Sequence, residues 1–174
     1  MPVLERNNVV TMKGNPMTLL GHDVAVGQKA PEATIVANDL SEVKISSFIG
    51  KKLIISVVPS LDTPVCDLQT KYFNTEAAKL GDSVKILTIS MDLPFAQKRW
   101  CGAGAGANAL QTVSDYRYAS FGEAYGLLIK NLRLLARAVL VIDASGTIQY
   151  KEIVGEVTKE PNYDAALNAL KTLK

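Results

Sequence analysis

The residues of this chain that could do chemistry are its two cysteines, Cys66 and Cys101. With the single histidine, they cannot supply the four ligands of a usual zinc site, so we expect no metal centre. The first eight residues contain an acid and no apolar core, which is unlike a signal peptide, and a cytoplasmic location is expected. Because thiols are mostly kept reduced there, the cysteines indicate redox or nucleophilic chemistry, or no role, rather than a structural disulfide.

Cys66 is a candidate nucleophile because it follows an expected helix start. Thr63 is a good N-cap, Pro64 suits the first helical position, and Gly81 comes just past the expected end. Unpaired N–H groups and the helix dipole stabilise an anion in the first turn, which favours the reactive thiolate. Helical spacing places Cys66 on the face of Phe73, toward the interior, and the Thr63 hydroxyl could bind a thiolate or a substrate oxygen. The alternative is that Cys66 is a small hydrophobic core residue.

Cys101 is a poorer first nucleophile. It lies at the end of a helix expected from Asp92-Leu93-Pro94 to Gly102, where the helix dipole disfavours an anion. The glycine–alanine stretch 102–107 follows directly and has few side chains to hold it, so we expect it to unfold locally at low cost. Such unfolding would let a second cysteine move to meet the first. The alternative is an inert thiol beside a flexible loop, and the stretch is a weak match to a phosphate-binding loop.

Arg137 is the candidate cation for such a site. It precedes a very apolar expected strand at 138–142, and a buried charge there would need a partner. A guanidinium offers several fixed donors to an anionic sulfur. From the residues alone, an exposed charge at a strand end is favoured, and Arg133 and Lys130 are competing cations. His22 is interpreted as a surface residue.

The pattern of the chain predicts an α/β protein. Extended segments at 9–12 and 17–20 flank a hairpin turn, followed by strands at 34–37, 53–58, 84–90, 138–142 and 147–154, a helical turn at 46–50, helices at 63–80, 92–102 and 119–125, and a last helix after Pro161. Continuous aliphatic runs such as 53–58 are typical of strands buried on both faces. The order β-α-β-α, hairpin, α predicts a mixed central sheet, is that of the thioredoxin fold, and follows an N-terminal β-hairpin extension.

Composition narrows the possible partners. The 174 residues are 48% hydrophobic and 21% charged, which indicates one globular domain over residues 1–174. The net charge of +2 is too small to favour nucleic acid or an anionic membrane surface. No apolar run approaches the roughly 20 residues of a membrane span.

Residues 59–66, Pro-Ser-Leu-Asp-Thr-Pro-Val-Cys, resemble the peroxiredoxin signature Pro-x-x-x-Thr-x-x-Cys. The longer form Pro-Ser-x-Asp-Thr-x-x-Cys resembles the thiol peroxidase subfamily, the atypical two-cysteine peroxiredoxins. The segment 92–102 is similar to the second-cysteine segment of that subfamily, with Trp100 at a position where Phe is expected. Residues 136–139 resemble its arginine segment. The Gly-Asn-Pro near the start and the Glu-Pro-x-Tyr near the end also match, so the resemblance covers nearly the whole chain.

The resemblance implies a four-residue site of Pro59, Thr63, Cys66 and Arg137. Cys66 would be the peroxidatic cysteine, and Cys101 the resolving cysteine that forms the intramolecular disulfide Cys66–Cys101. Pro59 would shield the sulfenate, while Thr63 and Arg137 would align the peroxide. The family implies reduction by thioredoxin, a homodimer, and no metal, haem or flavin cofactor.

Two alternative functions would use the same two thiols. A disulfide oxidoreductase is disfavoured because the chain has no Cys-x-x-Cys motif. A redox sensor or binding module could use the pair as a switch, and peroxide consumption with thioredoxin would separate it from an enzyme. We also expect the reduced thiols to lie beyond bonding distance, with the turn around Cys66 and the segment 100–108 unwinding on oxidation. The sequence leaves open whether hydrogen peroxide or an alkyl hydroperoxide is preferred.

Overall fold

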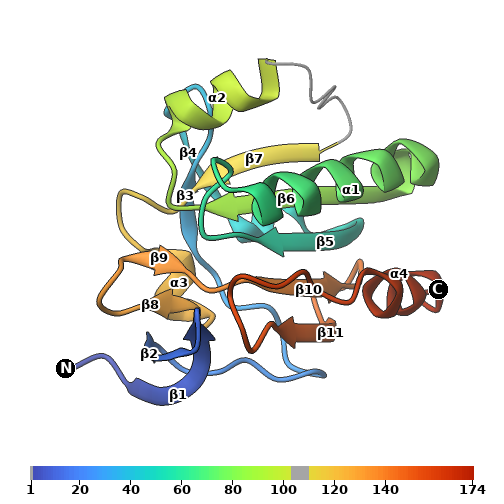
Figure 1. Ribbon diagram of the computed structural model, residues 1–174. Helices are drawn as coiled ribbons and strands as arrows, with labels where there is room; N and C mark the ends of the chain where they lie inside the picture. The colour runs from blue at the N-terminus through green and yellow to red at the C-terminus, as the bar shows by residue number, and fades with distance from the viewer. Residues whose placement is uncertain (1, 103–109) are drawn as a thin grey trace.

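A mixed β-sheet runs through the centre of the molecule (Figure 1). The computed structural model describes residues 2–102 and 110–174, and in that part of the chain seven strands join in the order β11-β10-β5-β6-β7-β3-β4. Strands β5, β6 and β7 run parallel, and the other neighbours are antiparallel. The bounds are Thr34–Val36 for β3, Glu42–Lys44 for β4, Lys52–Val57 for β5, Val84–Ser90 for β6, Leu110–Ser114 for β7, Ala138–Ile142 for β10 and Ile148–Ile153 for β11. The predicted α/β class with a mixed sheet is confirmed.

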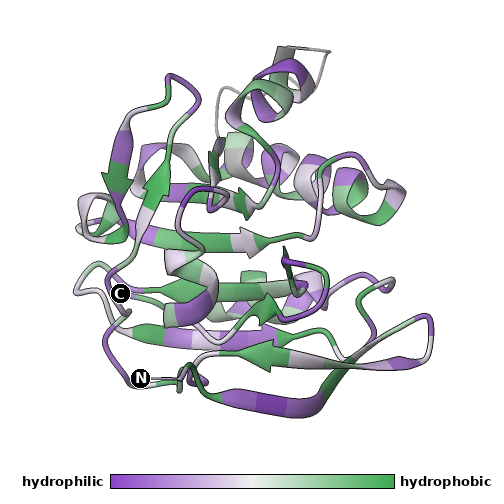
Figure 2. Cartoon of the chain, turned by 90° about the vertical axis from the view of Figure 1, so that its left-hand side faces the viewer, coloured by the Kyte–Doolittle hydropathy of each residue, from purple (hydrophilic) through white to green (hydrophobic). Residues whose placement is uncertain are grey.

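Helices cover both faces of this sheet. They are α1 at Pro64–Leu80, α2 at Pro94–Gly102, α3 at Ser120–Ala124 and α4 at Tyr163–Lys171, with 3-10 helices at Ile45–Phe48 and Gly81–Ser83. Figure 1 shows α1 lying along β6 and β5, and α2 packs against β7. Since successive strand residues point to opposite faces, Ile54 packs with Phe73 of α1, whereas Ile55 clusters with Phe121 of α3. The strands are accordingly largely green in Figure 2, while purple residues recur on the helices.

The N-terminal hairpin belongs to a second, smaller sheet. Strands β1 (Glu5–Met12) and β2 (Asn15–Leu20) pair as predicted, and β2 continues through β8 (Leu128–Ile129) to β9 (Leu134–Leu135). Lys13 and Gly14 form the turn with φ of 51° and 81°. Two consecutive positive φ values match the twist of a tight hairpin, and glycine adopts them without strain.

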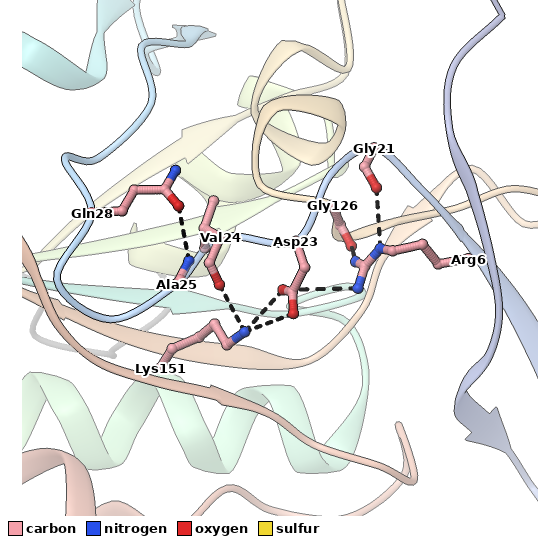
Figure 3. A network of polar contacts seen from close by, with 8 residues as sticks. All are labelled: Arg6, Gly21, Asp23, Val24, Ala25, Gln28, Gly126 and Lys151. Atoms are coloured by element: carbon pink, nitrogen blue, oxygen red, sulfur yellow. Dashed lines mark hydrogen bonds and ion pairs between the residues drawn. The ribbon is translucent and has the colours of Figure 1, made fainter.

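A polar network ties this hairpin to the rest of the molecule (Figure 3). Arg6 of β1 donates to the carbonyl oxygens of Gly21, at 3.1 Å, and of Gly126. Its guanidinium also lies 3.8 Å from the carboxylate of Asp23, which accepts from Lys151 of β11 at 2.9 Å. The hairpin is therefore anchored at its open end, which helps to fix its turn at the other end.

The helix boundaries agree with the predictions, whereas several strands were not predicted. Strands β4, β7, β8 and β9 are additions to the expected set. Of the glycine–alanine stretch, Gly102 ends α2, and residues 103–107 lie outside the described residues. In the part of the chain that is described, no helix is long and apolar enough to cross a membrane.

Candidate active site

The start of α1 places Cys66 in the interior. Thr63 is the N-cap with extended backbone angles, Pro64 is the first helical residue, and the Thr63 carbonyl accepts from the Asp67 N–H at 2.9 Å. Cys66 therefore lies in the first turn, and both it and Phe73 are fully buried on one face of the helix. The predicted position and orientation of Cys66 are confirmed. Burial also agrees with the core-residue alternative, so the neighbours of the sulfur decide what it can do.

The sulfur of Cys66 is hydrogen-bonded to a buried guanidinium. Arg137 is only 2% exposed and donates from Nη2 to Cys66 Sγ at 3.3 Å. Its Nη1 donates to Gln69 Oε1 at 2.9 Å, and its Nε donates to the Val157 carbonyl at 2.8 Å. The favoured interpretation of Arg137 as an exposed charge at a strand end is therefore wrong. Two fixed acceptors hold the planar group so that a third donor points at the sulfur.

Strand pairing brings Arg137 to this place. Ala138, the first residue of β10, pairs antiparallel with Val57, the last residue of β5. Because α1 starts just after β5, the residue before β10 lies beside the first turn of α1. The competing cations lie elsewhere: Arg133 is exposed, and Lys130 pairs with Glu5 at 2.6 Å.

Gln69 is a site residue that sequence reasoning missed. It is fully buried, accepts from Arg137, and donates from Nε2 to Ser56 Oγ at 2.8 Å. Both ends of its amide are therefore used, which fixes the oxygen toward the guanidinium. The available signal was its spacing, since Gln69 lies three positions after Cys66 and so shares its helix face.

A cavity of about 420 Å³ opens beside this group. Its lining comes from the hairpin turn, the loop between β5 and α1, the start of α1, the residue before β10 and the loop after β11, and comprises Met12, Lys13, Pro59, Thr63, Pro64, Val65, Arg137, Val157 and Thr158. Cys66 does not line the cavity, whereas Arg137 both lines it and touches the sulfur. A small molecule in the cavity would therefore meet the guanidinium first and the sulfur behind it.

Of the other predicted residues, Pro59 and Thr63 meet Arg137 at this cavity. Pro59 is buried at the end of the sheet. Thr63 is exposed, and its hydroxyl donates to the Ser60 carbonyl at 3.0 Å rather than to sulfur. That hydroxyl still has lone pairs to offer a molecule in the cavity.

The loop before α1 is held by Asp92. Its carboxylate accepts from the Ser60 hydroxyl at 2.6 Å, from the Leu61 N–H at 2.7 Å and from the Ser90 hydroxyl at 2.8 Å. Asp92 lies just after β6, so the neighbouring strand positions the residues that lead into the cysteine helix. This arrangement fixes the backbone between Pro59 and Thr63.

Cys101 occupies the last turn of α2, as predicted. It is half-buried, and its sulfur lies 3.5 Å from the Thr112 hydroxyl on β7. Both cysteines are free thiols. The residue before it, Trp100, donates from its indole to Asp67 of α1 at 2.9 Å. The two cysteine-bearing helices are therefore in direct contact although the sulfurs are not bonded.

Nothing in the described residues points to a metal. Across 2–102 and 110–174, no group of three or more His, Cys, Asp or Glu side chains could hold an ion. His22 is exposed, as interpreted from the sequence.

Comparison with known proteins gives a consistent result. The family model described as Redoxin matches residues 25–167. A thiol peroxidase of Halalkalibacterium halodurans is 58% identical over 162 residues, covering 93% of this chain and 96% of the relative. A thiol peroxidase of Bacillus subtilis is 54% identical over 164 residues, covering 94% of this chain and 97% of the relative.

Solved structures of similar proteins have the same fold as this chain. A peroxiredoxin-like protein from Aquifex aeolicus superposes with a TM-score of 0.88 at 42% identity, over 100% of both chains. A thiol peroxidase from Chromobacterium violaceum shares the fold, with a TM-score of 0.82 at 20% identity, over 93% of this chain and 94% of the other. These matches confirm the thioredoxin-type fold predicted from the order of elements.

Proposed function

This chain belongs to the Redoxin family and is a peroxiredoxin enzyme, and we propose that it reduces hydrogen peroxide and organic hydroperoxides with Cys66 as the nucleophile. The observation that carries the assignment is the 3.3 Å contact between Arg137 Nη2 and Cys66 Sγ at the base of the cavity. A guanidinium in that position stabilises the thiolate before reaction and the oxygen that departs during it.

The first step is displacement at oxygen. The Cys66 thiolate attacks the distal oxygen of the hydroperoxide, an S–O bond forms, and the O–O bond breaks. The two electrons come from sulfur, which becomes a sulfenic acid, and the alkoxide or hydroxide that leaves takes a proton to give alcohol or water. Arg137 faces the charge that develops on the leaving oxygen, and the Thr63 hydroxyl helps to align the peroxide. Pro59 shields the sulfenate from water.

The second step makes a disulfide. The Cys101 thiol attacks the Cys66 sulfenic acid, so that an S–S bond forms and one water leaves. Thioredoxin then reduces the disulfide to two thiols and becomes oxidised itself. A disulfide requires Cα atoms within about 7 Å, and we propose that Cys101 leaves its 3.5 Å contact with Thr112 to bond with Cys66. We further propose that the working unit is a homodimer and that no cofactor takes part.

The cavity supports a range of substrates. Its walls are mostly apolar, and they include Arg137, whose guanidinium contacts the Cys66 sulfur. A volume of about 420 Å³ exceeds the need of hydrogen peroxide and leaves room for the organic group of an alkyl hydroperoxide.

Two variants test the assignment in a peroxide-consumption assay with thioredoxin as the only reductant. Cys66→Ser should lose peroxide consumption and show no sulfenic acid. Cys101→Ser should consume about one equivalent of peroxide per chain and then stop when thioredoxin is the only reductant. Alkylation followed by mass measurement identifies which thiol has reacted. Oxidation of the Cys66 variant but not of the Cys101 variant would reverse the two roles.

A further inference from the structure

The helix that carries Cys101 is tied to the helix that carries Cys66 by residues adjacent to the cysteines themselves. Trp100 Nε1 of α2 donates to Asp67 Oδ1 of α1 at 2.9 Å. Trp100 directly precedes Cys101, and Asp67 directly follows Cys66. Any movement of Cys101 that displaces Trp100 from α1 must therefore break this hydrogen bond.

The indole is packed as well as bonded. Its ring lies half-buried against a small apolar cluster of Val58, Leu61 and Cys66. The other oxygen of Asp67 accepts from Lys71 at 2.7 Å, so the carboxylate is held from both sides. Hydrogen bonds to a carboxylate are stronger than those between neutral groups, and partial burial limits competition from water.

We propose that the Asp67–Trp100 hydrogen bond is a latch that sets the rate at which Cys101 reaches the oxidised Cys66. The latch rests on the proposed function, because it acts on the second step of that reaction. Cys101 must leave its 3.5 Å contact with Thr112, and Trp100 travels with it as the preceding residue. Asp67 and Trp100 are thus positioning residues that hold α2 in place while Cys66 reacts with peroxide.

The latch also governs a competition. The Cys66 sulfenic acid either condenses with the Cys101 thiol, giving a disulfide and water, or meets a second hydroperoxide. In the second case another O–O bond breaks, sulfur loses two more electrons and becomes a sulfinic acid, and the hydroperoxide leaves as an alcohol or as water. A tighter latch lengthens the life of the sulfenic acid and raises the sulfinic fraction at a given peroxide concentration.

Trp100→Phe is the direct perturbation, because it keeps an aromatic ring and removes the N–H donor. Loss of one such hydrogen bond to a carboxylate should raise the population of the opened α2 about tenfold. Disulfide formation should accelerate by about that factor, and the ratio of sulfinic acid to disulfide at high peroxide should fall by about the same factor. The rate at which the Cys66 thiol disappears should stay within twofold of the unmodified protein, on the order of experimental scatter.

Asp67→Ala removes the same bond from the other helix and leaves the chain's single tryptophan as a reporter. Asp67→Asn is the matched control, because its amide oxygen still accepts from the indole. In the assay, reduced protein is mixed with tert-butyl hydroperoxide and quenched with an alkylating reagent. Mass spectrometry then measures the amounts of the thiol, disulfide and sulfinic forms. Asp67→Ala should follow Trp100→Phe, and Asp67→Asn should lie closer to the unmodified protein.

The outcomes distinguish a failure of the latch from a failure of the proposed function. If the unmodified protein forms the disulfide with peroxide, and Trp100→Phe and Asp67→Ala form it no faster, the latch is overturned and the proposed function stands. If the unmodified protein forms no disulfide with peroxide, the proposed function itself fails. A slower disulfide step in both variants would mean that the contact guides Cys101 inward, which also overturns the latch.

Discussion

Replacement of Arg137 by alanine should be the most damaging single change that leaves both thiols in place. The guanidinium supplies the donor at 3.3 Å from Cys66 Sγ, and it lines the cavity that we propose admits the peroxide. Loss of one preorganised donor facing a developing charge typically lowers a rate by roughly 10²–10³, about 2.7–4 kcal/mol of barrier. We expect that loss in the rate at which Cys66 reacts.

The same replacement has a stability cost that the assay must separate. Without Arg137, the Gln69 amide oxygen and the Val157 carbonyl lose their buried donor, at 2.9 and 2.8 Å. Each stranded acceptor costs about 1–3 kcal/mol of folding free energy. The rate is therefore measured at a temperature where circular dichroism shows the variant folded. Arg137→Lys retains a charge but lacks the fork that satisfies both acceptors, so it should recover little of the rate.

Arg133→Ala is the matched control, since Arg133 is a nearby arginine of the same chain whose side chain is exposed. The measurement is a single turnover with one equivalent of hydrogen peroxide, followed by titration of the remaining thiols. Arg133→Ala should leave the rate close to that of the unmodified protein. Equal losses in the Arg133 and Arg137 variants would refute the assignment, because only one of these side chains touches the sulfur.

Three further changes test the surroundings. Gln69→Leu removes an acceptor that holds Arg137, and kcat/KM should fall about 10-fold, whereas an unchanged value would show that the Arg is positioned without it. Burial raises the pKa of Asp115 to about 6, which disfavours its charged form in the folded state, so stability should fall as pH rises from about 4 to 7. Denaturant unfolding should show this as a loss of up to about 3 kcal/mol relative to Asp115→Asn, and an opposite slope would contradict it. Hydrogen bonds that the Glu156 carboxylate accepts from Thr158 and from the Gly14 N–H lower the pKa of Glu156 to about 2 and pin the hairpin turn to the cavity wall. Glu156→Ala should raise KM for tert-butyl hydroperoxide and spare hydrogen peroxide, and equal effects on both would show that the wall does not contact substrate.

Local signals explain why the cysteine helix could be predicted well. Thr63, Pro64 and Gly81 each act within one helical turn of the end they mark, and the helix begins and ends where they indicate. The N-terminal hairpin follows from a turn of the same short range. Features that depend on neighbouring residues alone were therefore accessible before the fold was known.

Features that depend on distant pairing were not accessible. The environment of Arg137 follows from the antiparallel pairing of β10 with β5. No residue near Arg137 in the sequence indicates that pairing. Strand β7 has the sequence Leu-Gln-Thr-Val-Ser, and its polar residues conceal that β6 and α2 bury it. Gln69 was overlooked for the same reason, since its role requires Arg137 to arrive from another part of the chain.

The strand register also suggests how one sheet can hold its helices firmly and still let the cysteine segments move. On the face that carries α1, the side chains of β5, β6 and β7 form rows of paired neighbours across the three strands. One row is aliphatic and comprises Ile54, Ile86 and Leu110. The next row is polar and comprises Ser56, Thr88 and Thr112. The aliphatic row packs with Phe73 and with α4. Burial there contributes about 25 cal/mol of folding free energy per Å² of apolar surface. The polar row instead meets Gln69 and Cys101 through hydroxyl contacts, and of these the contact with the half-buried Cys101 is the one that water can replace at small net cost. We therefore expect α2 to detach at the end of the sheet beneath the thiols, while the aliphatic row keeps the rest of α1 in place.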